Sequence, residues 1–370
     1  MSKRPVLITA GGTGGHVYPG LAVARALEAQ DIPVVWMGTS KGLEARVIPA
    51  AGIEMAWLEV TGFRGKGVLT LVAAPFRLIK ALYQSVNIMR KHKPAAVLGM
   101  GGFVAGPGGL IAALMGIPLV IHEQNAIPGL TNRLLSKLSK KVLEGFPGSF
   151  VSAKDKAIQV GNPVREDISN LPAPAERMQG CSERRLRLLI IGGSLGAQAL
   201  NEVVPQALAE LSEELRPLTR HQAGRDKDVA TKACYQKAAV DADVSAFIDD
   251  MAEAYSWADL VICRSGALTV AELASAGLAS ILVPYPYAVD DHQTANGLCL
   301  SEPGAALLLP QTDLTSGALA NNLKTLLAEP KRLLQMGEKA RELAKPGATA
   351  EVAAIVAGMA NYTFNTEVAA

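Results

Sequence analysis

Aromatic and charged residues are scarce in this chain of 370 residues: aromatic residues make up 5% and charged residues 19% of it. Apolar residues reach 49%, which excludes an intrinsically disordered chain, because disorder requires low hydrophobicity and high charge. The net charge of +2 gives no reason to expect nucleic acid as a partner. The chain is too long for one ordinary core, so we expect two domains.

A paired arrangement of cysteines is also missing. The four cysteines, Cys181, Cys234, Cys263 and Cys299, contain no C-x-x-C pair, so the sequence predicts neither a zinc site nor a disulfide framework. A reducing cytoplasm is the expected compartment, and the short apolar run after Arg4 does not resemble a signal peptide. The uncharged stretch 94–121 is long enough to span a bilayer, but its seven glycines disfavour a continuous helix. We expect it to form a strand, a glycine loop, a helix and a second strand.

Short apolar runs alternate with helical stretches along the whole chain, which is typical of doubly wound parallel sheets. The expected strands are 6–9, 34–37, 96–98, 119–122 and 141–144, and then 186–191, 244–248, 260–263 and 280–284. Helices are expected between them, for example at 20–30 and 70–91. The predicted fold class is α/β, with two Rossmann-like domains (1–163 and 164–345) whose parallel sheets face a central cleft. A final helix, about 346–362, is expected to return to the first domain.

Three glycine-rich loops follow expected strands, at 11–16, 101–109 and 192–197. Glycine lets backbone amides approach an anion, and the start of the next helix adds favourable charge, so the first and third loops are candidate phosphate sites. A dinucleotide-binding oxidoreductase is disfavoured, because the G-x-G-x-x-G pattern and the acidic residue after the second strand are both missing. A P-loop kinase is disfavoured because no loop ends in G-K-[ST].

The run from Cys263 to Glu272 is the most informative part of the second domain. We predict a helix with Ser265 as N-cap and Gly277 as its end, so that the amides at its start can bind a diphosphate. Glu272 would lie near the same face as Ser265 and accept hydrogen bonds from both ribose hydroxyls. A solvated surface acid is the alternative, although the apolar neighbours of Glu272 indicate a buried carboxylate that needs a partner.

Five motifs occur in order along the chain, at 11–16, 122–125, 161–165, 192–194 and 264–272. Together they resemble the N-acetylglucosaminyltransferases of glycosyltransferase family 28, which convert lipid I to lipid II in peptidoglycan synthesis. The resemblance covers nearly the whole chain. It implies the GT-B fold, UDP-N-acetylglucosamine (UDP-GlcNAc) as donor, and inverting transfer to the C4 hydroxyl of the MurNAc in undecaprenyl-linked lipid I. It also implies a peripheral protein on the cytoplasmic face of the inner membrane.

This resemblance assigns the donor to the second domain. Ser194 and the amides of Ala267, Leu268 and Thr269 would contact the diphosphate, Glu272 the ribose, Ile248 the uracil and Gln293 the sugar. The wider donor set adds Asn125, Arg165, Arg264, Ser265, Gly266, Val270 and Ala271, and the acceptor phosphate is expected at Thr13, Gly14, Gly15, Gly101, Gly102 and Gly106. The third loop departs from the family at Leu195, where glutamine is frequent. That departure removes an expected side-chain contact but leaves the backbone cradle.

An inverting transfer needs a base for the acceptor hydroxyl and stabilisation of the departing UDP. His16 is the leading candidate base, because histidine changes charge near neutral pH. Glu123 is the rival, and a purely structural role for His16 is the further alternative. The helix beginning at Gly266 would stabilise the leaving group. The D-x-D run Asp241-Ala242-Asp243 is a pattern that arises easily by chance, so we predict no obligatory metal or cofactor.

Acidic residues are absent from 60–93, which contains seven basic ones. Apolar and basic side chains alternate there at helical spacing, and the predicted membrane patch consists of Leu69, Val72, Phe76, Arg77, Ile79, Lys80, Leu82 and Tyr83. A basic amphipathic helix is typical of contact with anionic lipid. A core-facing helix with a solvated basic face is the alternative. Arg133, Lys137, Lys140 and Lys141 would extend the patch.

Two other functions remain open from the sequence. A UDP-GlcNAc 2-epimerase of the same fold would need no lipid acceptor and would form its product from the UDP-sugar alone. A non-catalytic scaffold on the membrane surface would leave the glycine loops without a use, and it would not bind a UDP-sugar.

Overall fold

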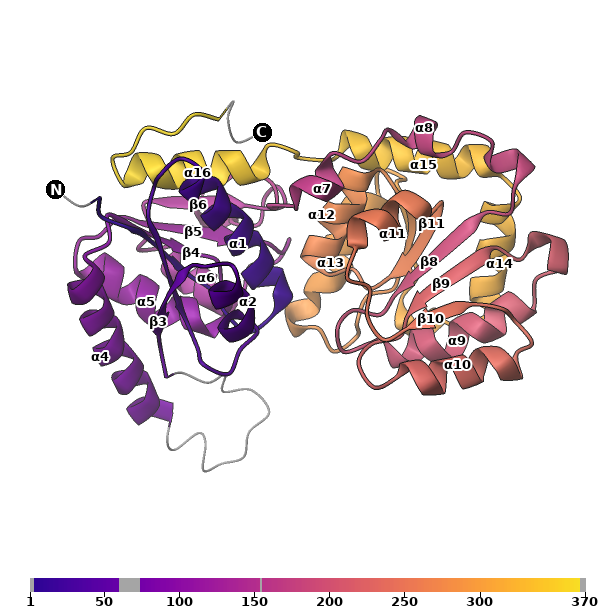
Figure 1. Cartoon of the computed structure of the whole chain (residues 1–370), viewed down its shortest axis with the longest axis horizontal. Coiled ribbons are helices and arrows are strands. Elements are labelled where there is room, and N and C mark those ends of the chain that lie inside the picture. The colour runs from indigo at the N-terminus through magenta and orange to yellow at the C-terminus, as the bar shows by residue number, and fades with distance from the viewer. Residues whose placement is uncertain (1–2, 60–73, 154, 367–370) are drawn as a thin grey trace. The chain divides into compact units, whose positions relative to one another are not determined.

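The computed structural model describes residues 3–59, 74–153 and 155–366 (Figure 1). It divides the chain into two units, Met1–Val164 with Lys345–Ala370 as unit 1, and Arg165–Ala344 as unit 2. Each division lies one residue from a boundary expected from the sequence. Each unit contains one parallel sheet, so the predicted α/β class of two Rossmann-like domains is confirmed.

Unit 1 contains a seven-stranded parallel sheet in the order β3-β2-β1-β4-β5-β6-β7. Its strands are β1 (Val6–Thr9), β2 (Val34–Gly38), β3 (Glu54–Trp57), β4 (Ala96–Gly99), β5 (Leu119–Glu123), β6 (Lys141–Glu144) and β7 (Ala157–Gln159). The strands from β1 to β5 other than β3 are buried along their whole length, as expected for a parallel sheet covered by helices on both faces.

Helices cover both faces of this sheet. They are α1 (Gly14–Glu28), α2 (Glu44–Ala50), α4 (Ala74–His92), α5 (Gly102–Leu114), α6 (Leu130–Leu135) and α16 (Ala348–Met359). Val6 and Ile8 pack in one cluster with α1 and α16, whereas Leu7 packs with α4, α5 and α6 in another. This alternation follows from the two-residue period of a strand. The predicted C-terminal helix therefore contributes buried residues such as Val352 to the core of unit 1.

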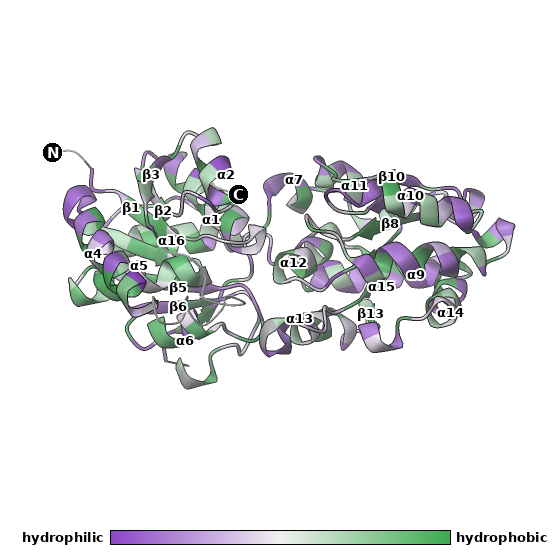
Figure 2. Cartoon of the chain, turned by 90° about the horizontal axis from the view of Figure 1, so that it is seen from below, coloured by the Kyte–Doolittle hydropathy of each residue, from purple (hydrophilic) through white to green (hydrophobic). Residues whose placement is uncertain are grey.

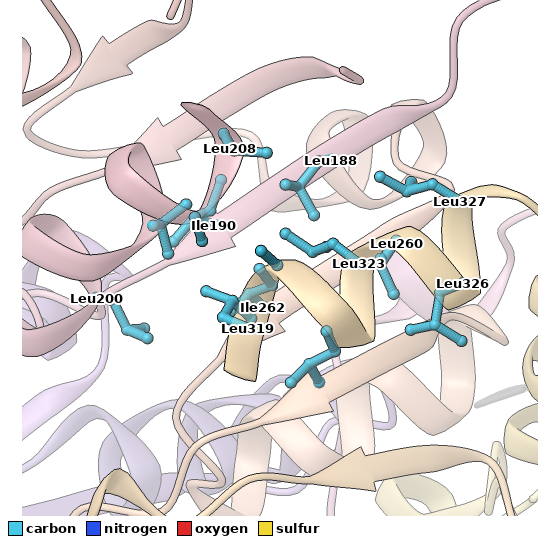
Figure 3. Packing of buried hydrophobic residues seen from close by; sticks show 14 of the residues in the cluster. Leu188, Ile190, Leu200, Leu208, Leu260, Ile262, Leu319, Leu323, Leu326 and Leu327 are labelled. Atoms are coloured by element: carbon cyan, nitrogen blue, oxygen red, sulfur yellow. The ribbon is translucent and has the colours of Figure 1, made fainter. Parts of the chain in front are cut away.

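Unit 2 contains a six-stranded parallel sheet in the order β10-β9-β8-β11-β12-β13. Its strands are β8 (Arg187–Ile191), β9 (Leu218–Gln222), β10 (Asp243–Ser245), β11 (Leu260–Cys263), β12 (Ala279–Leu282) and β13 (Ala306–Leu308). Its helices are α7 (Glu166–Ser169), α8 (Pro174–Arg177), α9 (Gln198–Ala209), α10 (Asp228–Lys237), α11 (Met251–Trp257), α12 (Ala267–Ala276), α13 (His292–Ser301), α14 (Ser316–Leu327) and α15 (Pro330–Glu342). Figure 3 shows leucines of α9 and α14 packed on β8 and β11.

The strand order reverses once in each sheet. In unit 1 the chain builds outward from β1 on one side and from β4 on the other, and in unit 2 it does the same from β8 and β11. In open parallel sheets, ligands bind beyond the carboxyl ends of the two strands at this switch point. The fold therefore selects the loops after β1 and β4 in unit 1, and after β8 and β11 in unit 2.

The second glycine loop is shorter than the sequence analysis predicted. Helix α5 begins at Gly102, so Gly106 lies in its second turn rather than in a phosphate-binding loop. The later glycines allow close packing: a Cβ on Gly108 would lie 2.0 Å from Cε of Met37, and one on Gly109 would lie 2.7 Å from Cδ1 of Leu135. Glycine in this stretch thus brings α5 against its neighbours rather than forming a loop.

Candidate functional site

The glycine loops after β1 and β4 lie against each other in unit 1. A Cβ on Gly102 would lie 2.7 Å from the backbone oxygen of Gly11, and one on Gly101 would lie 3.0 Å from Cδ2 of His16. Both Gly101 and Gly102 have positive φ, of 88° and 75°, a conformation that side chains disfavour. The two loops therefore need glycine both for their conformation and for their close contact.

His16 belongs to the first turn of α1 rather than to the loop itself. Helix α1 starts at Gly14 with Thr13 as N-cap, six residues earlier than predicted. Nδ1 of His16 lies 3.0 Å from Oγ1 of Thr13. Thr13, Gly14, Gly15, His16 and Gly101 are therefore gathered at one switch point, and Gly106 is not part of that group.

Glu44 fixes the first glycine loop through side-chain hydrogen bonds. This fully buried carboxylate accepts hydrogen bonds from the backbone N–H of Gly12 at 3.1 Å and from the N–H and hydroxyl of Thr39 at 3.0 and 2.6 Å. It thereby links the loop after β1 to the loop after β2. The sequence analysis missed Glu44, since an acid more than thirty residues from the loop has no local signal for this role.

Glu123 is also buried and saturated with donors. It accepts hydrogen bonds from the backbone N–H and side-chain amide of Asn125, from the N–H of Gly129 and from the amide of Asn132, at 3.0 to 3.1 Å. A carboxylate with four donors around it organises the loop from 124 to 132. This geometry favours a structural role for Glu123 over the role of base.

The motif 122–125 is joined to the motif 161–165 inside unit 1. Nε2 of His122 lies 2.9 Å from the backbone oxygen of Gly161, and the side-chain amide of Asn162 donates to the backbone oxygen of Gln124 at 3.0 Å. Burial lowers the pKa of His122 to about 4, so its imidazole is neutral at physiological pH. These contacts fix the end of unit 1 just before the chain enters unit 2.

The start of α12 presents backbone amides at the switch point of unit 2. Gly266, not Ser265, is the N-cap, and no side chain caps the helix. Our prediction of Ser265 as the cap was wrong, because that residue is still in the segment leading from β11 and its side chain is fully buried. The amides of Ala267, Leu268 and Thr269 occupy the first positions of the helix, where the N–H groups have no partner within the helix.

Glu272 lies in the second turn of α12 and is 9% exposed. Its Oε2 accepts a hydrogen bond from the hydroxyl of Tyr255 at 3.0 Å. Burial raises the pKa of Glu272 to about 7, while Arg165 and the Tyr255 hydrogen bond act in the opposite direction. The acid is therefore the buried carboxylate that the sequence predicted, and Tyr255 is a partner that the sequence analysis did not find.

The third glycine loop connects β8 to α9. A Cβ on Gly196 would lie 2.0 Å from the backbone oxygen of Ala223, so the loop is pressed against the end of β9. Ser194 and Leu195 are exposed in the loop, and the Leu195 side chain is 80% exposed. The predicted donor residues thus lie beyond the two strands that flank the switch point: Ser194 in the loop after β8, and Ala267 and Glu272 on the helix after β11.

Two predicted donor residues hold a neighbouring loop. The guanidinium of Arg264 donates to the backbone oxygens of Val283 and Pro284, each at 3.1 Å, and lies 5.4 Å from the centre of the Tyr285 ring. Oε1 of Gln293 accepts from the backbone N–H of Tyr285 at 2.9 Å. Arg264 and Gln293 therefore support the segment after β12 from two sides.

The remaining donor candidates lie in three places. Ile248 follows β10, which ends at Ser245 and is shorter than predicted. Phe247 beside it is 54% exposed and is a third residue, after Glu44 and Tyr255, that the sequence analysis did not single out. Arg165 is the N-cap residue of α7 in unit 2, whereas Asn125 belongs to unit 1.

No group of three or more His, Cys, Asp or Glu side chains within the described residues has an arrangement suited to a metal ion. Asp243 is the first residue of β10, and Asp241 lies just before it, at the amino end of the strand. The carboxyl ends of the strands, where the glycine loops lie, are at the other edge of the sheet. The D-x-D run is therefore remote from the switch point.

Helix α4 carries an apolar surface on its outer side, and Figure 2 shows green and purple bands along it. Phe76, Ile79 and Tyr83 are 74%, 63% and 67% exposed, whereas Leu82 is half-buried against the core of unit 1. Lys80 forms an ion pair with Glu59. Leu69 and Val72 lie outside the described residues. No helix in the described part of the chain is both long and apolar enough to span a membrane.

Other exposed apolar side chains accompany this surface. Leu130, Leu134 and Leu138 are exposed on and after α6, with Arg133 and Lys137 between them in the sequence. Helix α5 packs against both α4 and α6. We call the exposed residues Phe76, Ile79, Tyr83, Leu130, Leu134 and Leu138 the apolar surface of unit 1.

Comparisons with known proteins agree with this geometry. Models of the glycosyltransferase family 28 N-terminal and C-terminal domains match residues 6–144 and 187–352. An Alkalilimnicola ehrlichii protein described as UDP-N-acetylglucosamine--N-acetylmuramyl-(pentapeptide) pyrophosphoryl-undecaprenol N-acetylglucosamine transferase is 56% identical, with 95% of this chain and 98% of that protein covered.

Solved structures are also similar to this chain. The crystal structure of Acinetobacter baumannii MurG is 42% identical, covers 96% of this chain and 99% of that one, and has a TM-score of 0.82. A UDP-GlcNAc 2-epimerase from Neisseria meningitidis covers 94% of this chain and 98% of that one with a TM-score of 0.66, but at 12% identity it shares the fold alone. The chain belongs to glycosyltransferase family 28.

Proposed function

We propose that this protein is an inverting glycosyltransferase that moves N-acetylglucosamine from UDP-GlcNAc to the C4 hydroxyl of MurNAc in undecaprenyl-linked lipid I, giving lipid II. The observation that carries this proposal is the pairing of an uncapped helix start with a buried acid, Glu272, at the switch point of unit 2. The high identity to transferases of this name supports the same reaction.

The donor site consists of groups that match the parts of a nucleoside diphosphate sugar. The amides at the start of α12 and the glycine loop with Ser194 hold the two phosphates, because N–H groups and the helix dipole stabilise negative charge. Glu272 accepts hydrogen bonds from the ribose hydroxyls, and Phe247 and Ile248 adjoin the base. Gln293, held by the loop after β12, meets the sugar.

The transfer forms a bond from the acceptor oxygen to the anomeric carbon while the bond from that carbon to UDP breaks. UDP leaves with the electron pair, and the helix start at Gly266 stabilises the charge on its phosphate. His16 takes the proton of the acceptor hydroxyl. The position of His16 in the first turn of α1, beside Thr13 and Gly101, supports this role better than the saturated surroundings of Glu123.

The protein binds peripherally to the cytoplasmic face of the inner membrane through the apolar surface of unit 1. Exposed aromatic and aliphatic side chains next to lysine and arginine are suited to the interface of an anionic bilayer. Such a location brings unit 1 to the lipid-linked acceptor.

The reaction is tested with labelled UDP-GlcNAc and a lipid I analogue, using wild type, Glu272→Ala and His16→Ala. We expect labelled lipid II from wild type, a raised KM for the donor in Glu272→Ala and a lowered kcat in His16→Ala. Product formed from UDP-GlcNAc without the lipid would instead identify an epimerase. Activity that EDTA abolishes and only a divalent ion restores would reject the metal-free mechanism.

Membrane contact is tested by flotation with anionic vesicles. Phe76→Glu should reduce co-flotation several-fold, because it places a charge in the apolar surface of unit 1. Val229→Glu is the matched control, since Val229 is 76% exposed on α10 in unit 2. Equal flotation of wild type and Phe76→Glu would reject this surface as the contact.

A further inference from the structure

Tyr255 is a buried tyrosine whose hydroxyl is used at the donor site. It lies on α11, which packs against α12, and its ring is 1% exposed. The hydroxyl donates to Oε2 of Glu272 at 3.0 Å. Within the described residues, this is the one hydrogen bond that the structure gives to the Glu272 carboxylate.

Glu272 accepts fewer hydrogen bonds than the two buried carboxylates that hold loops in unit 1. Glu44 and Glu123 each accept three or four hydrogen bonds from protein groups, which fill the acceptor positions of their oxygens. A carboxylate can accept about four hydrogen bonds, so Glu272 with its single donor keeps acceptor capacity for a ligand. The Tyr255 hydroxyl occupies one acceptor position on Oε2 of Glu272.

We propose that Tyr255 is a positioning residue for Glu272, and that its hydroxyl holds the carboxylate in the orientation in which it accepts both hydroxyl groups of the donor ribose. The inference rests on the proposed function, because it takes the ribose of a UDP-sugar as the ligand of Glu272. Tyr255 itself is buried behind the carboxylate and acts through it.

The hydroxyl also keeps Glu272 in the ionised form that can accept. A protonated carboxyl group becomes a donor and loses acceptor capacity. Burial and Asp167 raise the pKa of Glu272, whereas Arg165 and the Tyr255 hydrogen bond lower it. The other titratable neighbour, Cys263, has its pKa raised to about 12 by burial and by Glu272, so it remains a neutral thiol. Removing the hydroxyl takes away one of two groups that favour the anion.

The first experiment is calorimetric titration with UDP-GlcNAc between pH 6 and 8.5, where the diester phosphates of this ligand do not change charge. For wild type, we expect the affinity to rise with pH through about 7, as Glu272 ionises. Tyr255→Phe should move this midpoint up by about one pH unit, which at pH 7 is a roughly fivefold larger Kd. Above the midpoint, the two proteins should differ by about threefold or less.

The second experiment compares UDP with 2′-deoxy-UDP at pH 8, where both ligands carry the same phosphate charge. Wild type should prefer UDP, because the missing hydroxyl removes a hydrogen bond to Glu272. Tyr255→Phe should reduce this preference about threefold, since a carboxylate that is no longer oriented discriminates less. If Tyr255 had a purely structural role, Tyr255→Phe would lower the affinities for UDP and 2′-deoxy-UDP by the same factor. The ratio of the two affinities would then stay at the wild-type value.

Tyr235→Phe is the matched control. Tyr235 is also buried in unit 2, but its hydroxyl lies 2.9 Å from Nδ1 of His221 and does not contact Glu272. The Tyr235→Phe variant should keep the wild-type midpoint in the pH dependence of affinity and the wild-type preference for UDP over 2′-deoxy-UDP. Glu272→Gln provides a second route if Tyr255→Phe is unstable, because its affinity should show no midpoint near pH 7.

The outcomes separate this inference from the proposed function. If wild type binds UDP-GlcNAc and Tyr255→Phe retains both the midpoint and the UDP preference, Tyr255 is not a positioning residue. A pH-independent wild type with Glu272→Gln of equal affinity would also overturn the inference. If wild type binds neither UDP-GlcNAc nor UDP, the proposed function itself fails.

Discussion

Each unit has one parallel sheet, but the buried acids near the switch points of the two sheets differ in how many protein donors surround them. In unit 1, Glu44 and Glu123 are surrounded by protein donors. In unit 2, Glu272 has one donor and a raised pKa. The comparison teaches that burial alone does not identify a ligand-binding acid. The number of protein hydrogen bonds that a buried carboxylate accepts distinguishes an acid that holds a loop from one that awaits a ligand.

Glu44→Ala tests the structural side of this comparison and should have the largest effect. It leaves the N–H groups of Gly12 and Thr39 without their acceptor in a buried position, so we expect a loss of about 4 kcal/mol in the free energy of unfolding. Guanidinium unfolding measures this loss, and hydrogen exchange at residues 11–16 localises it. Unchanged exchange in that segment would contradict the role of Glu44.

The pH dependence of stability tests the other side. Folding raises the pKa of Glu272 to about 7, so protonated Glu272 adds to the free energy of unfolding. This stabilisation is present in full below the ordinary pKa of 4.5 and is lost as the pH rises through 7. The loss is on the order of 3 kcal/mol. Glu272→Gln should remove it, so the stability difference between the two proteins should change between pH 4.5 and 7.5. Calorimetric melting without ligand measures this difference, and a constant difference would be inconsistent with a shifted Glu272.

Glu272→Ala should affect the donor more than the fold. Losing charge-assisted hydrogen bonds to the ribose should raise the Kd for UDP-GlcNAc about thirtyfold, or about 2 kcal/mol, at pH 8. Glu253→Ala is a suitable control, since Glu253 is exposed on α11 and pairs with Arg220. Isothermal titration gives both values. Similar affinities for the two variants would remove Glu272 from the donor site.

The glycine loops of the two units can be compared through one glycine in each, and this comparison has the smallest expected effect. Gly102 and Gly193 have similar positive φ, 75° and 77°, but a Cβ would meet the Gly11 carbonyl at 2.7 Å in the first case and open space in the second. Gly193→Ala should therefore cost about 1 kcal/mol from backbone strain. Gly102→Ala should cost about 1 kcal/mol more, because it adds a clash with backbone. Equal melting temperatures for the two variants would mean that the loops of unit 1 can separate without cost.

Much of the fold could be predicted from the sequence, because buried parallel strands appear as short apolar runs. Strands β1, β11 and their neighbours were found this way, and the motifs at 11–16, 192–194 and 264–272 follow the strands at the two switch points. Boundaries were less accurate where glycine was involved. Glycines at 14, 15 and 102 were expected in loops, yet they begin helices, since the packing around them outweighs their low helix propensity.

The partners of the buried acids could not be predicted. Tyr255 is seventeen residues from Glu272, and Glu44 is thirty-two residues from Gly12, so these contacts depend on how helices and loops meet in the folded chain. Ser265 was predicted as a cap because serine is a favoured residue there, but the backbone enters the helix one residue later. Phe247 was missed because a single exposed aromatic residue in a loop has no periodic pattern.

The return of α16 to unit 1 has a consequence for biosynthesis. Val352 and Val356 complete one face of the unit 1 core, but the ribosome adds them only after the whole of unit 2. Unit 2 is continuous in sequence and can close its own core first, while the nascent unit 1 still exposes apolar surface around α1. Unit 1 begins first at the ribosome but therefore cannot complete its core until unit 2 has been translated, unlike a domain that is continuous in sequence.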